Sequence, residues 1–199
     1  MNIGRQVSHG VFWVGVSTLT AQMLAFVTSL VLMRILPRSD FGLLTSATVA
    51  INALQLFREL GFSAALIYRK DRIREAADTM FVLLILISLV LYATALVGAG
   101  PIATFFYHEG AQLSDRRQMA EILRLLGLIM VLGSFGQVPL TMLAKEMNFR
   151  KRLLPDIVPE VVKDVLTITL ALNGFGVWSL VYGQIVDIAL TAALAWVVA

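Results

Sequence analysis

The protein has 199 residues, of which 58% are hydrophobic and 15% are charged, and its net charge is +3. Ordinary soluble domains carry roughly 25% charged residues, so this composition excludes that class and predicts an integral membrane protein. The sequence contains no cysteine, which excludes disulfides and thiolate chemistry. No patch of clustered Lys and Arg with interleaved aromatic residues resembles a nucleic-acid-binding surface, so we expect no nucleic-acid partner.

Apolar runs of about 20 residues, enough for one bilayer crossing each, predict six transmembrane helices. Their ranges are roughly 11–36, 41–67, 79–106, 119–144, 155–173 and 176–199. The apolar run after His9 is too long for a removable signal peptide, so we expect it to remain as the first span. The sequence therefore predicts an all-α polytopic membrane protein whose residues 1–199 form a single six-helix lobe.

The connections at 37–40 and 173–176 are short. Pro37 ends the first predicted helix, and Ser39 or Asp40 is expected to accept the free amide hydrogens that open the second. Asn173 and Gly174 tolerate left-handed backbone geometry. Because short connections favour antiparallel neighbours, we expect the first helix to pack on the second and the fifth on the sixth.

Basic residues are unevenly distributed between the two sets of connections. One set carries Arg5, Arg69, Lys70, Arg72, Arg74, Lys145, Arg150, Lys151 and Arg152, and the other carries Arg34, Arg38, Arg116 and Arg117. Cytoplasmic loops are enriched in Lys and Arg, so the first set is expected to face the cytoplasm. This orientation places the N-terminus in the cytoplasm.

A polar stripe runs along the second span. Its members recur at helical spacing and fall within one sector of the helix: Thr45, Thr48, Asn52, Gln55, Glu59 and Ser63. A lipid-facing Glu59 would cost about 2.5 kcal/mol or more near the bilayer centre, so the stripe should face protein or water. It predicts either a seam between helices or one wall of a solute path, and both interpretations remain open.

Three further spans carry shorter polar stripes. They are Thr18, Gln22 and Ser29 in the first, Ser134, Gln137 and Thr141 in the fourth, and Gln184, Asp187 and Thr191 in the sixth. We expect the four stripes to converge on a shared polar interior. The third span carries few polar residues and is expected to face lipid the most.

Ionisable residues inside the spans are candidates for function. Arg58 would either pair with an acid such as Asp187 or present its guanidinium to an anionic headgroup. Asp187 has no basic neighbour within a helical turn, so it needs an ion-pair partner, water, or a proton or other cation that couples transport. Glu160, Lys163 and Asp164 share a helix face, so they are expected to neutralise one another near the inner surface, with a substrate contact as the alternative.

Motifs for catalysis are absent from the sequence. No His, Asp or Glu set has metal-ligand spacing, and there is no Gly-rich phosphate loop and no nucleophile motif. We therefore expect neither enzymatic activity nor a cofactor.

Four stretches together resemble a known family. They are LPRSDFG at 36–42, FRELGFSAALIYRKD at 57–71, PLTMLAKEMNFRKR at 139–152 and GFGVWSLVYGQ at 174–184. In order and spacing they resemble the polysaccharide transporter branch of the multidrug/oligosaccharidyl-lipid/polysaccharide flippase superfamily, which serves O-antigen, capsule and exopolysaccharide assembly. The resemblance implies movement of an undecaprenyl-pyrophosphate-linked glycan across the bacterial inner membrane by alternating access, with an ion gradient or the membrane potential supplying direction.

Several residues are candidates for the substrate path or for ion coupling. The resemblance points first to Arg58 and Glu59, and the polar stripes then point to Asp187 and Gln184. Asn52, Gln55, Gln22 and Lys163 complete the set. Family members carry two six-helix bundles, so we expect this chain to be an amino-terminal lobe that lacks its carboxy-terminal partner or pairs with a second copy.

Three alternatives belong to other classes. A multidrug and toxin extruder would share the lobe but place carboxylates in its cavity without a companion arginine. A membrane-embedded glycosyltransferase or acyltransferase would need catalytic acids or histidines in a substantial loop. A structural or assembly subunit would have no transport activity of its own.

Overall fold

The computed structural model describes residues 3–58, 73–106, 113–145 and 149–198. Within these ranges the secondary structure is α-helical. The helices are α1 (Ile3–Ile35), α2 (Arg38–Arg58), α4 (Ile73–Phe106), α5 (Leu113–Lys145), α6 (Phe149–Leu172) and α7 (Val177–Val198). The prediction of an all-α membrane protein is confirmed.

Three of the described helices are long and apolar enough to cross a membrane by length and composition. The qualifying segments are Thr79–Phe106 in α4, Ser114–Leu143 in α5 and Val177–Val198 in α7, and α1 adds the shorter apolar stretch Leu19–Ile35. In the most apolar segment of α4 only 17% of the residues are buried, whereas the share is 39% in the corresponding segment of α5 and 22% in that of α7. The third predicted span is therefore the least covered of these three, as expected.

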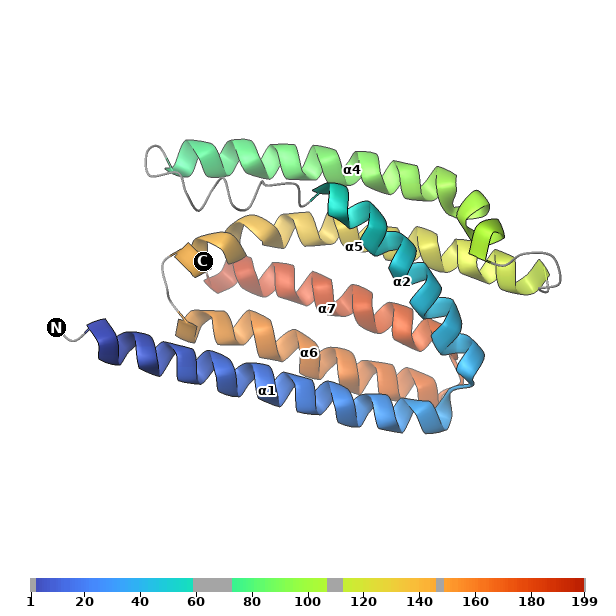
Figure 1. Cartoon of the computed structure of the whole chain (residues 1–199), viewed down its shortest axis with the longest axis horizontal. Helices are drawn as coiled ribbons and strands as arrows, with labels where there is room; N and C mark the ends of the chain where they lie inside the picture. Colours follow the sequence, from blue (N-terminus) through green and yellow to red (C-terminus); the bar gives the residue numbers. More distant parts are fainter. Residues whose placement is uncertain (1–2, 59–72, 107–112, 146–148, 199) are drawn as a thin grey trace.

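The helices form a layered bundle in which each long helix packs on its neighbour. Figure 1 shows five helices side by side, in the order α4, α5, α7, α6 and α1, with α2 lying diagonally to them. The packing contacts follow the same order, and α2 packs against α5, α4 and α7. The connections at 36–37 and 173–176 lie at the same end of the bundle.

The prediction that α1 packs on α2 is wrong. After the turn at Pro37 the two helices diverge, and α1 lies along α6 instead (Figure 1). The two helices diverge because the apolar side of α2 packs elsewhere. Its residues Leu43, Ala47 and Ile51 are buried in a core shared with α4, α5 and α7. Burial of that side directs α2 away from α1. The predicted pairing of the fifth and sixth helices, α6 and α7, is confirmed.

Helix α6 starts earlier than predicted. It begins at Phe149 and continues through Pro155 and Pro159, both of which are inside the helix and fully buried. Each proline removes one backbone donor from the helix. The charged first half of this span is therefore helical as well.

A proline also interrupts α5, and a tryptophan from α7 compensates for it. Pro139 lies inside α5 and has no N–H to donate to the carbonyl of Phe135, four residues earlier. The indole Nε1–H of Trp196 donates to that carbonyl over 2.8 Å. Phe81 of α4 packs edge-on against both rings, with centroids 5.9 Å from Phe135 and 5.8 Å from Trp196. The three helices are thus joined beside the proline.

The short connection after α6 is a Schellman motif. The amide of Gly174 donates to the carbonyl of Ala171 and that of Phe175 donates to Leu170. Gly174 has a φ of 80° and Gly176 a φ of 56°, as expected for a connection that needs left-handed residues. The chain then enters α7 at Val177.

Asp40 does not act as the predicted cap of its own helix. Its carboxylate accepts the backbone N–H of Val177, the first residue of α7, and it also has a hydrogen bond to the Ser39 side chain. A Cβ on Gly176 would lie 3.1 Å from Asp40 Oδ2, so the carboxylate lies directly against the glycine. Asp40 therefore ties the turn before α2 to the start of α7. Burial raises the pKa of Asp40 above its ordinary value of 3.8, and the two hydrogen bonds oppose that shift.

We predict that Trp196→Phe lowers the free energy of unfolding by about 1 kcal/mol, because the Phe135 carbonyl loses its donor. Pro139→Ala supplies an N–H within the helix for the same carbonyl. The cost of Trp196→Phe should therefore shrink in the Pro139→Ala background. Unfolding of the four proteins in a denaturing detergent, followed by circular dichroism, measures this coupling. Equal losses in both backgrounds would contradict the proposed compensation.

We predict that Asp40 makes stability decrease as the pH rises from about 4. Its raised pKa means that the folded chain holds a proton over a pH range in which the unfolded chain has released it. Asp40→Asn should remove this contribution while keeping an acceptor for Val177. Asp40→Ala should cost about 1 kcal/mol because the amide loses its acceptor. Thermal unfolding in mild detergent across this pH range tests both; an Asn variant with unchanged pH dependence would refute the assignment.

Candidate functional site

A pocket of about 180 Å³ lies between α2 and α7, with α5 at its floor. Its walls combine amide, hydroxyl and carboxyl groups with aliphatic side chains. The residues that line it are Thr48, Ile51, Asn52, Gln55, Leu126, Ile129, Gln184, Asp187 and Ile188. Polar groups from two helices that are far apart in the sequence therefore meet here.

Helical periodicity explains how α2 contributes to this pocket. Thr48, Asn52 and Gln55 recur every three or four residues and so lie on one side of the helix. The apolar positions of α2 pack against α5 and α4, which leaves the polar stripe beside α7. From α5, Leu126 and Ile129 close the space between the two polar walls.

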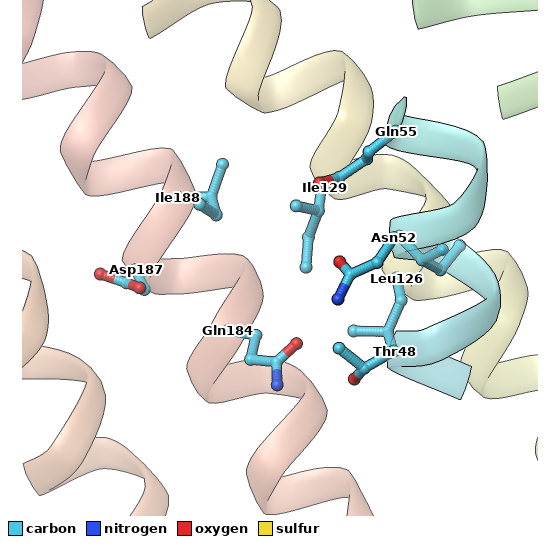
Figure 2. Close-up of a pocket in the computed structure, with 9 residues that line it drawn as sticks. Thr48, Asn52, Gln55, Leu126, Ile129, Gln184, Asp187 and Ile188 are labelled. Carbon is cyan, nitrogen blue, oxygen red and sulfur yellow. The ribbon is translucent and has the colours of Figure 1, made fainter. Parts of the chain in front are cut away.

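The side chains around the pocket differ in where they point. Figure 2 shows Asn52, Thr48 and Gln184 directed into the space between α2 and α7, whereas the carboxyl group of Asp187 points away from α2. The electrostatic neighbours of Asp187 are on α6, namely Lys163, Glu160 and Asp164. The groups that enter the pocket are thus neutral amides and a hydroxyl, and Asp187 lies between the pocket and α6.

The chemistry of this pocket is hydrogen bonding. Carboxamides and hydroxyls can both donate and accept hydrogen bonds. Ligand pockets usually measure about 300–1,000 Å³, so a pocket of this size would hold only part of a larger ligand. The aliphatic floor adds an apolar contact surface.

Four of the residues predicted from the sequence line this one pocket: Asn52, Gln55, Gln184 and Asp187. Gln22 does not, because it is exposed on α1. Arg58 is the last residue of α2, and its side chain lies outside the described residues. Glu59 lies wholly outside them, so the roles of Arg58 and Glu59 stay predictions.

The sequence predicts that the polar stripes of α1 and α5 converge with those of α2 and α7. Their described residues do not line this pocket. Ser29 donates to the carbonyl of Ala25 over 2.8 Å, and Thr141 donates to that of Gln137 over 2.7 Å. Ser134 likewise bonds the Val131 carbonyl at 2.6 Å. These hydroxyls are satisfied by their own helices. Only the stripes of α2 and α7 converge here.

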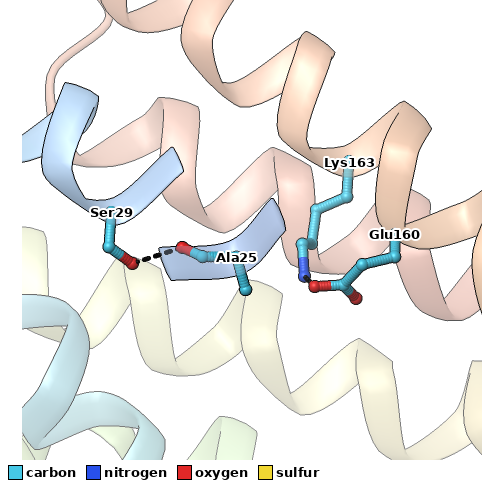
Figure 3. Close-up of polar contacts among 4 residues, drawn as sticks. All are labelled: Ala25, Ser29, Glu160 and Lys163. Atoms are coloured by element: carbon cyan, nitrogen blue, oxygen red, sulfur yellow. Dashed lines mark hydrogen bonds and ion pairs between the residues drawn. The ribbon is translucent and has the colours of Figure 1, made fainter. Parts of the chain in front are cut away.

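The predicted cluster on α6 forms only in part. Lys163 and Glu160 make an ion pair, drawn in Figure 3, and the side chain of each is 21% exposed. Asp164 interacts electrostatically with this pair, but it is only 4% exposed and its hydrogen bond is to the hydroxyl of Thr28 on α1. Neighbouring residues on a helix point about 100° apart, so Asp164 turns away from Lys163. Thr28 was missed from the sequence because a single threonine within an apolar run does not stand out.

Comparison with known proteins identifies a family that matches this chain and proteins that are similar to it. The sequence profile of a family described as "Polysaccharide biosynthesis protein" matches residues 31–199. The "Succinoglycan biosynthesis transport protein ExoT" of Rhizobium meliloti (strain 1021) is 30% identical over 176 residues, which cover 88% of this chain and 34% of that protein. The "Teichuronic acid biosynthesis protein TuaB" of Bacillus subtilis (strain 168) is 26% identical over 148 residues, covering 74% of this chain and 29% of that protein. The chain spans about a third of the length of these relatives. No solved structure matches it.

We predict that Gly183→Ala destabilises the lobe, because α7 crosses α6 at this glycine. A Cβ at position 183 would lie 2.1 Å from the hydroxyl oxygen of Thr167, so the two atoms would overlap, and Thr167 is buried. Gly42→Ala is the matched control, since a Cβ there meets no atom within 4 Å. An alanine in an open helical position is expected to gain about 0.5–1 kcal/mol. Equal melting temperatures for the two variants would contradict this close approach.

Proposed function

Because the chain belongs to the polysaccharide biosynthesis protein family, we propose that it forms the amino-terminal lobe of a flippase for lipid-linked oligosaccharides. The flippase would move an undecaprenyl-pyrophosphate-linked glycan from the inner to the outer leaflet of the bacterial inner membrane. The names of the two relatives, a succinoglycan transport protein and a teichuronic acid biosynthesis protein, support a polysaccharide as cargo. The membrane-spanning character of α4, α5 and α7 agrees with such a role.

The pocket between α2 and α7 is the observation that carries this proposal. Asn52, Gln55 and Gln184 place amide groups in a pocket beside the hydrophobic core that α2, α4, α5 and α7 share. Sugars present many hydroxyl groups, and amides can both donate to them and accept from them. The pocket would form part of the wall along which the glycan passes.

Transport by alternating access requires a second lobe for this one to rock against. The chain covers 34% and 29% of its two relatives, which leaves ample length for such a lobe in each of them. We propose that the second lobe is a carboxy-terminal bundle or, in a half-length protein, a second copy of this chain. The N-terminus would lie in the cytoplasm, because the connections on that side carry most Lys and Arg residues.

We propose that the protein carries no catalytic activity of its own. The single ionisable side chain that lines the described pocket is Asp187, and its carboxyl points away from α2 (Figure 2). General acid–base catalysis needs a proton donor and acceptor within reach of the reacting group. Direction would come from a proton or another cation, or from the membrane potential.

The test measures glycan display at the surface of a bacterium that lacks its own flippase. We predict that Asn52→Leu and Gln184→Leu, each introduced into the full-length protein, reduce display about tenfold, the equivalent of about 1.4 kcal/mol of hydrogen bonding. Thr94→Val is the matched control, because Thr94 is exposed on α4 and bonds the Val90 carbonyl of its own helix. Normal display by both pocket variants at normal abundance would contradict the proposal.

The same bacterium separates the alternatives. Display restored only by the full-length protein supports a two-lobe transporter, and display restored by residues 1–199 supports a dimer. If neither restores display and lipid-linked intermediates do not accumulate, glycan transport is refuted. Resistance to cationic drugs would then favour an extruder, and a missing lipid-linked product would favour an enzyme.

A further inference from the structure

A second polar group lies apart from the pocket, between α1, α6 and α7. It consists of Thr28, Asp164 and Thr167, which are 6%, 4% and 5% exposed, and we call it the inner polar cluster. Thr167 packs against Gly183 of α7, and Asp164 is hydrogen-bonded to Thr28 of α1. Asp164 is therefore enclosed from both neighbouring helices.

The hydrogen bonding of Asp164 is incomplete. One carboxyl oxygen accepts the hydroxyl of Thr28. The other, Oδ2, is buried and has no hydrogen-bond partner among the described residues. An ionised carboxylate is a strong acceptor at both oxygens, and burying one oxygen without a donor is unfavourable. The surroundings therefore suit a neutral carboxyl better than a charged one.

The charged groups near Asp164 also fit a neutral carboxyl. On α6 the charged neighbours of Asp164 are Lys163 and Glu160, which are paired with each other (Figure 3). On α7, Asp187 is near enough to interact with Asp164 electrostatically. α1 contributes the neutral Thr28, and the charged residues of α5 for which side chains are described fall between 115 and 124, in its first turns. Among the side chains that the structure describes, the cation that acts on Asp164 is Lys163, and Glu160 is already paired with it.

We propose that Asp164 is a proton-binding site of this lobe and that it holds its proton at neutral pH. The step is the addition of one proton from solution to the carboxylate, which forms one O–H bond and changes no other bond. A proton suits this site better than a metal ion, because no group of three His, Cys, Asp or Glu side chains in the described chain could hold one.

The site communicates with the pocket through Asp187. That residue lines the pocket, and its carboxyl interacts electrostatically with Asp164, so loss of the proton from Asp164 adds a negative charge near the pocket wall. This consequence rests on the proposed function: in a proton-driven flippase, Asp164 would link the proton gradient to the glycan path. Proton binding itself does not depend on the cargo.

Infrared spectroscopy of the purified chain in lipid nanodiscs tests the proposal. A protonated carboxyl gives a C=O stretching band that is distinct from carboxylate bands and shifts in heavy water. At neutral pH this band should be present in the wild type and lost in Asp164→Asn. The matched control is Asp156→Asn, an exposed position on the same helix, which should leave the band in place.

A second variant keeps the test decisive if Asp164→Asn does not fold. Thr28→Val removes the hydroxyl that donates to Asp164, so the band should move to higher frequency without disappearing. In a pH titration the variant should also keep its proton to a higher pH than the wild type, because the lost hydrogen bond favoured the charged form. A band that is absent at neutral pH, or that neither variant alters, overturns the proposal.

These spectra involve no glycan, so the two proposals can fail separately. A missing band would refute proton binding and leave the flippase proposal intact. A clear Asp164 band in a protein that fails the display test would refute glycan transport and leave the proton site standing. In a functional full-length protein, Asp164→Asn should abolish the dependence of display on external pH.

Discussion

The close approach of α7 to its neighbours is the constraint on which the rest of this lobe depends. Gly183 lets α7 lie against Thr167 of α6, and Gly136 of α5 lies so close that a Cβ there would be 3.0 Å from the backbone of Ala192. In a membrane, helices associate through such close packing because there is little hydrophobic gain from association in lipid. The positions of both polar sites follow from where these contacts place α7.

The two polar sites differ in chemistry because they lie on different sides of α7. Gln184, directly after Gly183, faces α2 and contributes an uncharged amide to the pocket. Gly183 itself faces α6, where Asp164 is buried. A neutral hydrogen-bonding surface and a titratable group are thus kept apart by a single helix, with Asp187 beside both.

Periodicity and length predicted most of the helices, because both depend on local sequence and on bilayer thickness. The same periodicity correctly grouped Asn52 and Gln55 with Gln184 and Asp187. It could not predict the partner of α1, because a short turn fixes only the proximity of two helix ends and not their angle. It grouped Asp164 with Lys163 and Glu160 but could not predict the hydrogen bond of Asp164 to Thr28, since spacing along one helix carries no information about another. For the same reason it offered Asp40, beside Ser39, as a cap of the second helix and could not predict the bond of Asp40 to Val177.

The hydrogen bond from Val177 to Asp40 has a consequence for the order in which the lobe assembles. It connects the turn before α2 to the start of α7, so most of the chain lies between its two partners. Closing so long a loop carries an entropic cost that only the packing of the intervening helices can offset. During synthesis α1, which lies along α6, must likewise wait for a late helix. By this argument α1 and α2 reach their final positions only after α6 and α7 have been made, so the bundle completes its fold as one unit.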